Sequence, residues 1–325
     1  MPPDIHMDPR LERRLAEKKA ALDLQRPLSP AIVSKLYDDL RVRLTYHSNA
    51  IEGNTLDLSE TQLVVDHGVT IGGHTMREHL EAVHHADAYA LLLDLARAEA
   101  PLDEAALQAL HALALRELVD APGEYRRAAV FISGSEHRPP HHTLVPQLMR
   151  ELVKWIVTEG QAYTPIIRAA LTHQMFLAIH PFPDGNGRTA RLLLNLQLMR
   201  DGYPIVLLLA SQRLGYIRAL GQADRGQYGA LVNLIGRAVE TGLDMFLEAC
   251  AAVPDEQLRS LPEVAEECAI TADYLGWLLR AGRIAGQKRR GRWYTSVAAV
   301  RRYQQEVAER AVPVGRPRKG RSAGE

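Results

Sequence analysis

Apolar positions recur at helical spacing along most of this chain, and they predict a mainly helical protein. The clearest helix is predicted over Leu171–His180, where apolar residues repeat every four positions. Pro181 and Pro183 cannot continue a helix, so the chain must turn directly after it. A second, leucine-rich helix is predicted over Arg188–Met199, and a longer helical run begins near Pro30.

The pattern changes at residues 252–257, where a proline and polar residues interrupt it. Beyond this point the sequence predicts two short helices, a strand pair with a basic turn, and a last helix, which is the order of a winged helix-turn-helix. The expected elements are a helix from a capping box at Ser260 and Glu263 to Cys268, a helix over Thr271–Ala281, two strands within Arg283–Tyr294, and a helix from Ser296 to about Glu309. We therefore divide the chain into an N-terminal segment (residues 1–29), a large domain (30–252), a small domain (255–310) and a disordered basic tail (311–325).

Charge separates these two domains. The 325 residues include 39 Lys and Arg and 39 Asp and Glu, so the net charge is zero. From Arg280 to Glu325 there are thirteen basic and three acidic residues, a charge of +10, which leaves −10 on residues 1–279. A basic end favours a polyanion such as DNA, contacted by the predicted wing residues Lys288, Arg289, Arg290 and Arg292. A protein-docking role for the same domain stays open.

Other classes of protein fit less well. Two isolated cysteines do not make a disulfide framework, and they are typical of a reducing compartment. The thirteen histidines form no pattern of metal ligands. No stretch reads as a signal peptide or a membrane span, so we expect a soluble, cytoplasmic protein that makes no membrane contact.

Catalytic chemistry is concentrated at the turn between the two best-defined helices. His180 is a candidate general base near neutral pH. Asp184 offers the oxygen ligand that Mg²⁺ (or Mn²⁺) prefers. Gly185-Asn186-Gly187 opens the second helix, whose free backbone N–H groups attract anions. Arg188 and Arg191, three positions apart, can reach successive phosphates, so the loop is suited to nucleotide chemistry.

These residues resemble the Fic family, since His180-Pro-Phe-Pro-Asp-Gly-Asn-Gly-Arg-Thr-Ala-Arg191 matches the signature H-P-F-x-[DE]-G-N-G-R-x-x-R without a mismatch. The similarity runs from about Ile32 to about Val239. It implies an all-helical core with a small β-hairpin flap, and transfer of AMP from ATP to a Ser, Thr or Tyr hydroxyl of another protein. By this resemblance the histidine is the base, the aspartate holds Mg²⁺, the Gly-Asn-Gly run and Arg188 bind phosphates, and Arg191 binds the γ-phosphate.

A second motif lies upstream, at Ser48-Asn-Ala-Ile-Glu52-Gly53-Asn54. Gly53 is a residue type that ends helices in a left-handed conformation. Glu52 therefore lies at the negative end of a helix dipole, where a carboxylate needs a cationic partner. The segment resembles the [ST]-x-x-x-E-[GN] inhibitory motif of Fic proteins, here on a helix over residues 31–54. The resemblance implies that Glu52 pairs with Arg191 and inhibits the enzyme.

The resemblance also implies how targets bind. Fic proteins carry a flap where this chain has Gly123–Thr143, and the flap aligns an extended target segment. Ala129–Gly134 within it predicts a short strand and a turn. We also expect a homodimer. Adenine contacts are implied for Tyr216–Tyr228, where Ile217 and Asp224 replace a frequent tyrosine and asparagine, so the base stays open.

Two alternatives to the transferase remain. Glu52 can orient a water molecule, which would make the protein a hydrolase that removes AMP from modified targets. Alternatively, the Fic core is a sensor in a DNA-binding regulator. The last domain resembles the winged helix-turn-helix modules of excisionase and MerR-type proteins, and the tail at Gly315–Arg321 resembles an AT-hook, which lays arginines in the minor groove.

Overall fold

A computed structural model of the chain describes residues 5–28, 30–132, 135–251, 258–289 and 291–311. The described residues are mainly helical with one small sheet, as predicted. They divide into two compact units, Met1–Leu22 with Leu36–Glu248 and Asp23–Lys35 with Ala249–Glu325. The predicted boundary at residues 252–257 and the predicted tail from residue 312 onward lie outside the described residues.

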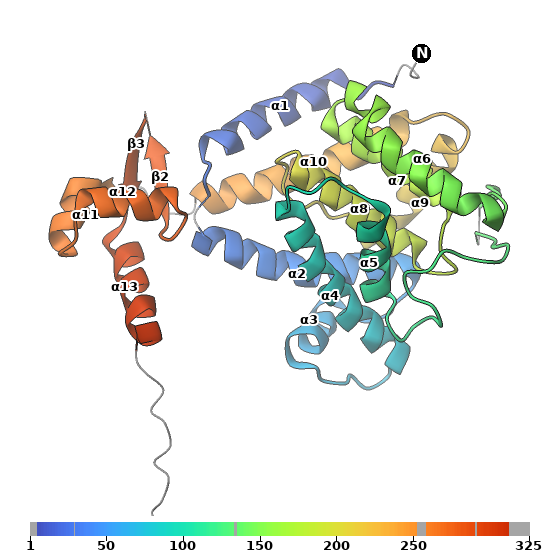
Figure 1. Cartoon of the computed structure of the whole chain (residues 1–325), viewed down its shortest axis with the longest axis horizontal. Helices are drawn as coiled ribbons and strands as arrows, with labels where there is room; N and C mark the ends of the chain where they lie inside the picture. The colour runs from blue at the N-terminus through green and yellow to red at the C-terminus, as the bar shows by residue number, and fades with distance from the viewer. Residues whose placement is uncertain (1–4, 29, 133–134, 252–257, 290, 312–325) are drawn as a thin grey trace, which may run out of the picture. The chain divides into compact units, whose positions relative to one another are not determined.

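The larger unit is built from helices (Figure 1). Their bounds are α1 Pro9–Leu24, α2 Pro30–Glu52, α3 Leu58–His67, α4 Met76–Arg97, α5 Glu104–Ala114, η1 His142–Leu144, α6 Val145–Val157, η2 Glu159–Ala162, α7 Pro165–Ile179, α8 Asn186–Arg200, η3 Ala210–Gln212, α9 Arg213–Ala223 and α10 Gly229–Ala251. The predicted helix before the catalytic turn is α7, which begins six residues earlier than the apolar pattern indicates, at Pro165. The leucine-rich helix is α8.

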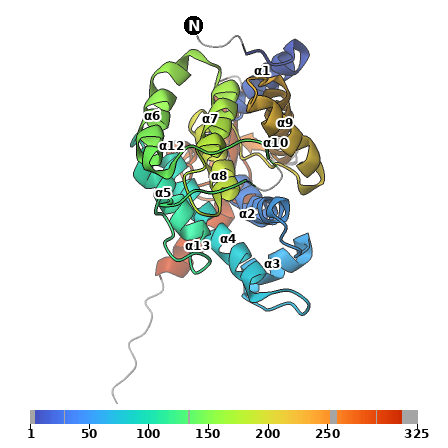
Figure 2. The same ribbon diagram turned by 90° about the vertical axis from the view of Figure 1, so that its right-hand side faces the viewer.

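Helix α8 forms the centre of this unit. Its leucines at positions 192, 193, 194, 196 and 198 are all fully buried, so the helix is enclosed on every side. It packs against α7, α4 and α5 (Figure 2). Because the helix itself is immobilised in the core, the motif residues on its first turn are held on a rigid support.

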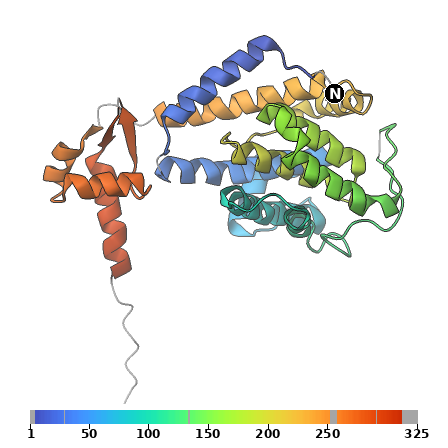
Figure 3. The ribbon, with the colours of Figure 1, turned by 45° about the horizontal axis from the view of Figure 1, so that its top comes forward.

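The N-terminal helices α1 and α2 complete the larger unit. Helix α1 lies along α10 (Figure 3), where Arg14 binds Glu240 at 2.7 Å and Lys18 binds Asp244 at 2.7 Å. Helix α2 ends at Glu52, as predicted, and Gly53 follows with φ of 106°. The helix therefore stops where a left-handed residue is available.

The smaller unit contains short helices and a hairpin in the expected order along the chain. Helices α11 (Leu261–Glu267) and α12 (Ala272–Arg280) precede an antiparallel hairpin of β2 (Gly286–Arg289) and β3 (Arg292–Thr295), and α13 covers Val297–Ala311. The capping box at Ser260 and Glu263 is present. One strand was not predicted, because the two residues of β1 (Arg259–Ser260) are too few to give an alternating pattern; they pair with β3. A core around Leu275, Leu278 and Val300 holds these elements together.

The flap differs from its prediction. Residues 129–132 form no strand, and residues 133–134 lie outside the described part of the chain. The predicted turn at Gly134 therefore lies outside the described residues as well, and of its neighbours the Ser135 N–H donates to the Ile132 carbonyl at 3.1 Å. An isolated two-stranded ribbon gains little stability in water, which explains an extended loop here in place of a ladder.

Among the described residues, no helix is apolar over the length needed to cross a bilayer.

Candidate active site

The proposed base ends α7. His180 adopts a left-handed conformation with φ of 50°, and its backbone N–H still donates to Phe176. Its Nδ1 lies 3.3 Å from the Leu177 carbonyl, and a carbonyl only accepts, so the proton is on Nδ1. Burial lowers the pKa of the His180 imidazole. The ring is therefore neutral near pH 7, with a free lone pair on Nε2, which is the form that a general base needs.

The conformation of the motif loop depends on the Asn186 side chain and on two glycines. Asn186 accepts from the Phe182 N–H at 2.9 Å and donates to the Phe182 carbonyl at 2.8 Å. Its amide is thus committed to the loop, and any anion contact from this residue must come from its backbone N–H. A Cβ on Gly185 would collide with the Leu115 side chain, and one on Gly187 would collide with the Glu52 carboxylate. Gly185, with φ of 75°, therefore requires glycine, whereas a side chain at Gly187 is excluded only while Glu52 stays in place.

A buried histidine on α5 binds the backbone of the motif loop. His111 accepts from the Gly123 N–H at 2.8 Å through Nδ1, so its Nε2 carries the proton that is donated to the Asp184 carbonyl at 3.0 Å. The ring stacks on Phe182 at 3.7 Å between centroids. Burial lowers the pKa of His111 to about 4, so the ring is neutral. This role of His111 was not predicted from the sequence.

Arg126 joins the flap to the catalytic turn. It is 4% exposed. Its guanidinium donates to the carbonyls of His180 at 2.8 Å and Pro140 at 2.6 Å, and its backbone N–H donates to the Pro181 carbonyl. The sequence had placed Arg126 only at the start of the flap. Both ends of the flap are thereby fixed beside the histidine.

Arg191 is buried among oxygen atoms of the upstream motif. Its Nε donates to the Ser48 hydroxyl at 2.9 Å, and its Nη2 donates to the Ser48 carbonyl at 2.8 Å and to Glu52 Oε1 at 2.7 Å. Arg191 is 2% exposed, whereas the Glu52 side chain is 40% exposed. Burial raises the pKa of Glu52, but the charge and hydrogen bond of Arg191 lower it by more, so the carboxylate is ionised. The pairing expected between Glu52 and Arg191 is present in the structure.

A second pair of side chains holds Arg191 from the other side. Tyr216 on α9 hydrogen-bonds to Arg191 and lies 2.7 Å from His173 Nε2. The Nδ1 of His173 lies 3.0 Å from the Ala190 carbonyl, so Nδ1 carries the proton and Nε2 accepts from the tyrosine hydroxyl. Burial lowers the pKa of His173 to about 4. A neutral histidine thus fixes the direction of the tyrosine hydroxyl, leaving its oxygen to accept from Arg191.

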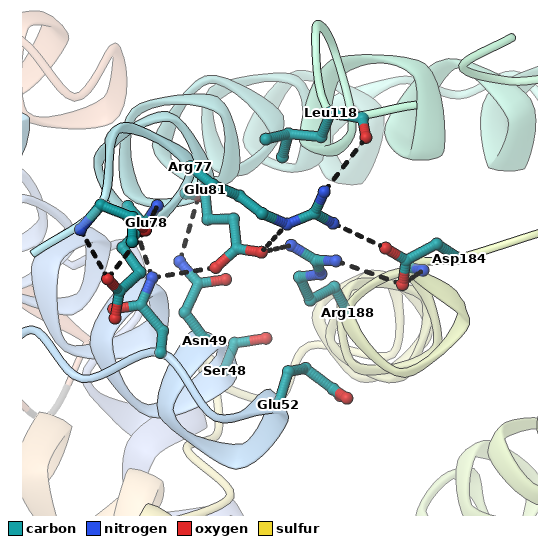
Figure 4. Close-up of polar contacts among 12 residues, drawn as sticks. Ser48, Asn49, Glu52, Arg77, Glu78, Glu81, Leu118, Asp184 and Arg188 are labelled. Carbon is teal, nitrogen blue, oxygen red and sulfur yellow. Dashed lines mark hydrogen bonds and ion pairs between the residues drawn. The ribbon is translucent and has the colours of Figure 1, made fainter. Parts of the chain in front are cut away.

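Arg188 belongs to a network of four charges (Figure 4). It lies 3.3 Å from Glu81 and 3.5 Å from Asp184, and Arg77 on α4 also approaches both of these acids. Arg188 is 3% exposed. Glu81 also accepts from Asn54 at 3.0 Å, two residues beyond Glu52. Arg77 and Glu81 were not predicted, because nothing in the spacing of α4 distinguishes them from a surface pair.

Asp184 is suited to a metal ion that takes most of its ligands from elsewhere. Its side chain is 47% exposed. Within the described ranges, no three or more acidic, histidine or cysteine side chains are grouped so that they could hold a metal ion. One carboxylate at the edge of an anion-binding helix end fits Mg²⁺, which keeps waters and binds through one or two carboxylates plus substrate phosphates. The donor set therefore fits a nucleotide-bound Mg²⁺ and not a permanent metal centre.

A cleft of about 810 Å³ is lined by part of this site, and Asp184 and Arg188 are not among its lining residues. Its lining includes His180, Gly187, Arg191 and Glu52 from the motifs. Most of the remaining lining comes from the flap and from α9 with the two residues that follow it, including Ile132, His137, Ile217, Asp224 and Arg225. The volume is within the range of small-molecule sites. The segment expected to contact the base therefore forms one wall of the cleft, and the flap forms another.

Comparison with known proteins identifies the family. Residues 101–198 match the model of the Fic/DOC family, a range that includes the whole motif. The larger unit is a Fic domain. The chain is 32% identical over 237 residues to the protein adenylyltransferase Fic of Nematostella vectensis, covering 68% of this chain and 53% of the relative. It is 33% identical over 220 residues to protein adenylyltransferase fic-1 of Caenorhabditis elegans, covering 66% and 43%.

Solved structures show the same domain. A Fic domain-containing signalling protein from Bacteroides thetaiotaomicron superposes with a TM-score of 0.68 at 28% identity, over 74% of this chain and 98% of that protein. Fic-1 of C. elegans gives a TM-score of 0.69 at 26% identity, over 75% and 73%. The chain spans only about half the length of the curated relatives named above.

Proposed function

We propose that this Fic protein is an autoinhibited protein adenylyltransferase, which transfers AMP from ATP to a Ser, Thr or Tyr hydroxyl of a target protein. One observation carries the proposal: a neutral histidine, an anion-binding helix start and a buried arginine line a single cleft. The curated relatives bear the name of this activity.

The chemistry requires one proton transfer and one exchange of bonds at phosphorus. The target hydroxyl oxygen attacks the α-phosphorus of ATP, the bond to the bridging oxygen breaks, and pyrophosphate leaves. His180 Nε2 takes the hydroxyl proton. The backbone N–H groups at the start of α8, with Arg188, hold the phosphates in line. Mg²⁺ (or Mn²⁺), held by Asp184, would neutralise the phosphate charge.

Inhibition follows from competition for Arg191. If Arg191 binds the γ-phosphate, it must leave Glu52, since one guanidinium edge cannot serve both anions. Glu52 also fills the space next to Gly187. Phosphate oxygens entering that space meet a carboxylate of the same charge. ATP therefore binds productively only when Glu52 has moved.

The target docks along the flap, Gly123–Thr143. Its described part exposes backbone groups that no ladder occupies, and an extended peptide can pair with them. Phe131 is 78% exposed on this segment, which suits contact with an apolar side chain of the target.

Automodification tests the proposal. A Glu52→Gly variant offered each nucleoside triphosphate in turn should gain a nucleotide adduct detectable by mass spectrometry, with ATP preferred. Adding His180→Ala should abolish the adduct, because general base catalysis contributes about 10²–10⁴-fold. Activity that survives loss of His180 contradicts the mechanism. Glu99→Gly, which removes an exposed glutamate elsewhere, is the matched control.

Removal of AMP is the alternative reaction at the same site. Glu52 lines the cleft together with His180, so its exposed carboxylate oxygen can orient a water molecule. In that case the wild-type protein, but not Glu52→Gly, releases AMP from the automodified chain. If neither protein releases AMP, the only role left for Glu52 is inhibition of the transferase.

A second candidate function belongs to the smaller unit. Exposed Lys288 and Arg292 lie on the β2–β3 hairpin beside α12, an arrangement that suits binding of duplex DNA. The predicted contact Arg290 lies outside the described residues, and Arg289 packs over Tyr294. The full chain should bind duplex with an affinity that falls steeply with salt, and Lys288→Glu with Arg292→Glu should weaken it. If the chain ignores duplex at low salt, we assign the unit to protein contacts.

A further inference from the structure

The carboxylate expected to hold the metal already has cationic partners. Asp184 Oδ2 accepts from Arg77 Nη2 at 2.9 Å, and Oδ1 accepts from the Gly185 N–H at 2.6 Å. Arg188 lies 3.5 Å from Oδ1. Both carboxylate oxygens are therefore engaged by groups of this chain (Figure 4).

Arg77 reaches this position from outside the motif. It lies in the first turn of α4, and its guanidinium also approaches the Leu118 carbonyl at 3.4 Å and Glu81 at 3.3 Å. These two acceptors are separate from Asp184, so the guanidinium has other partners when it leaves the aspartate. Arg77 lies outside the part of the chain that matches the family model.

The two arginines beside Asp184 differ in their freedom to move. The Arg188 side chain is 3% exposed, and moving it would leave a charge without its partners in the core. The Arg77 side chain is 51% exposed. It can turn toward water with little loss of hydration, so its contact with Asp184 is the one that can be exchanged.

We propose that Arg77 competes with the divalent metal for Asp184, and so sets the metal affinity of the site. This inference rests on the proposed function, in which Asp184 is the metal ligand. A guanidinium hydrogen bond and a metal bond use the same oxygen lone pairs, and two cations this close repel each other. Metal bound with nucleotide displaces Arg77, whereas Arg188 stays with Glu81 and the phosphates.

Binding of Mn²⁺ measures the competition without turnover. The fraction of free Mn²⁺ is followed by electron paramagnetic resonance, in the presence of a non-hydrolysable ATP analogue. All variants carry Glu52→Gly, so that the analogue can bind productively. Arg77→Ala should lower the Mn²⁺ dissociation constant by about fivefold, the upper range for breaking an exposed ion pair.

Arg97→Ala is the matched control. Arg97 lies on the same helix, α4, and pairs with Asp94 at 3.5 Å on the surface. It is twenty residues from Arg77, which is roughly 30 Å along a helix. The Arg97→Ala substitution removes the same charge at a place far from the site, so it should leave the Mn²⁺ dissociation constant unchanged.

Asp184→Ala separates this inference from the function it rests on. If Asp184→Ala leaves Mn²⁺ affinity unchanged, the metal assignment itself fails. If Asp184→Ala weakens Mn²⁺ binding while Arg77→Ala leaves it unchanged or weakens it, the competition is refuted and the metal site stands. Tighter binding in Arg77→Ala and no change in Arg97→Ala support the inference.

Discussion

Replacing Glu52 by glutamine separates the charge of the inhibitory contact from its bulk. Glutamine keeps the volume that lies against Gly187, and its amide oxygen can still accept from Arg191. Only the negative charge is lost. A variant that differs from the wild type by charge alone therefore tests whether the proposed inhibition comes from the ion pair or from simple obstruction by the Glu52 side chain.

The size of the effect follows from the environment of the pair. A hydrogen bond to a charged group contributes about 1.5–3 kcal/mol when buried. Here the Arg191 side chain is 3% exposed, but that of Glu52 is 40% exposed, so water screens part of the interaction. We take about 1–2 kcal/mol for the charge, which corresponds to about a 5- to 30-fold shift between inhibited and competent states.

Initial rates of automodification with labelled ATP measure this shift. Glu52→Gln should be about 5- to 30-fold faster than wild type, and Glu52→Gly at least as fast as Glu52→Gln. Glu99→Gln, an equal charge change on an exposed residue, should match wild type. A Glu52→Gln protein as slow as wild type, beside an active Glu52→Gly protein, would refute the charge argument and leave bulk as the cause.

Further expectations concern pH, nucleotide choice and stability. Burial lowers the pKa of His180 from its ordinary value of 6.5, so in a deinhibited variant the fall in rate at acid pH should be centred below pH 6.5; a fall centred above pH 6.5 would contradict a buried neutral base. Tyr216 holds Arg191, the proposed partner of the γ-phosphate, so Tyr216→Phe should raise KM for ATP with little change in kcat. ADP has no γ-phosphate, so its binding, measured by calorimetry, should be unchanged. His111→Ala should lower the melting temperature through a loss of about 2–4 kcal/mol. Because the pKa of His111 is lowered from 6.5 to about 4, the unfolded chain binds the extra proton first; stability is full above pH 6.5 and declines as pH falls toward 4, by up to about 3 kcal/mol, an effect that the variant should lose.

Local patterns predicted the elements of the site better than the contacts around them. The turn after His180 and the end of α2 at Glu52 follow from proline and glycine, which act on their immediate neighbours. The pairing of Glu52 with Arg191 spans 139 positions and came from family resemblance, since no local pattern encodes it. The roles of His111 and Arg77 depend on tertiary packing and remained hidden.

The C-terminal unit shows the same division. A capping box and a glycine-containing turn placed its helices and its hairpin. The pairing of β1 with β3 was missed, because two residues carry no periodicity. For the flap, local β propensity at Ala129–Gly134 predicted a strand, yet a strand needs a partner that the sequence cannot supply.

The position of Glu52 in the last turn of α2 has a consequence for how quickly the enzyme can respond. Ser48 and Glu52, one turn apart, both bind Arg191, and only Glu52 adjoins the glycine that ends the helix. Fraying of a terminal helical turn takes place within microseconds and leaves the preceding turns intact. Release of the glutamate thus needs no movement of the whole helix. If Glu52 inhibits as proposed, rising nucleotide concentration should draw the frayed population into the bound state by mass action, and the degree of inhibition should vary with the supply of ATP.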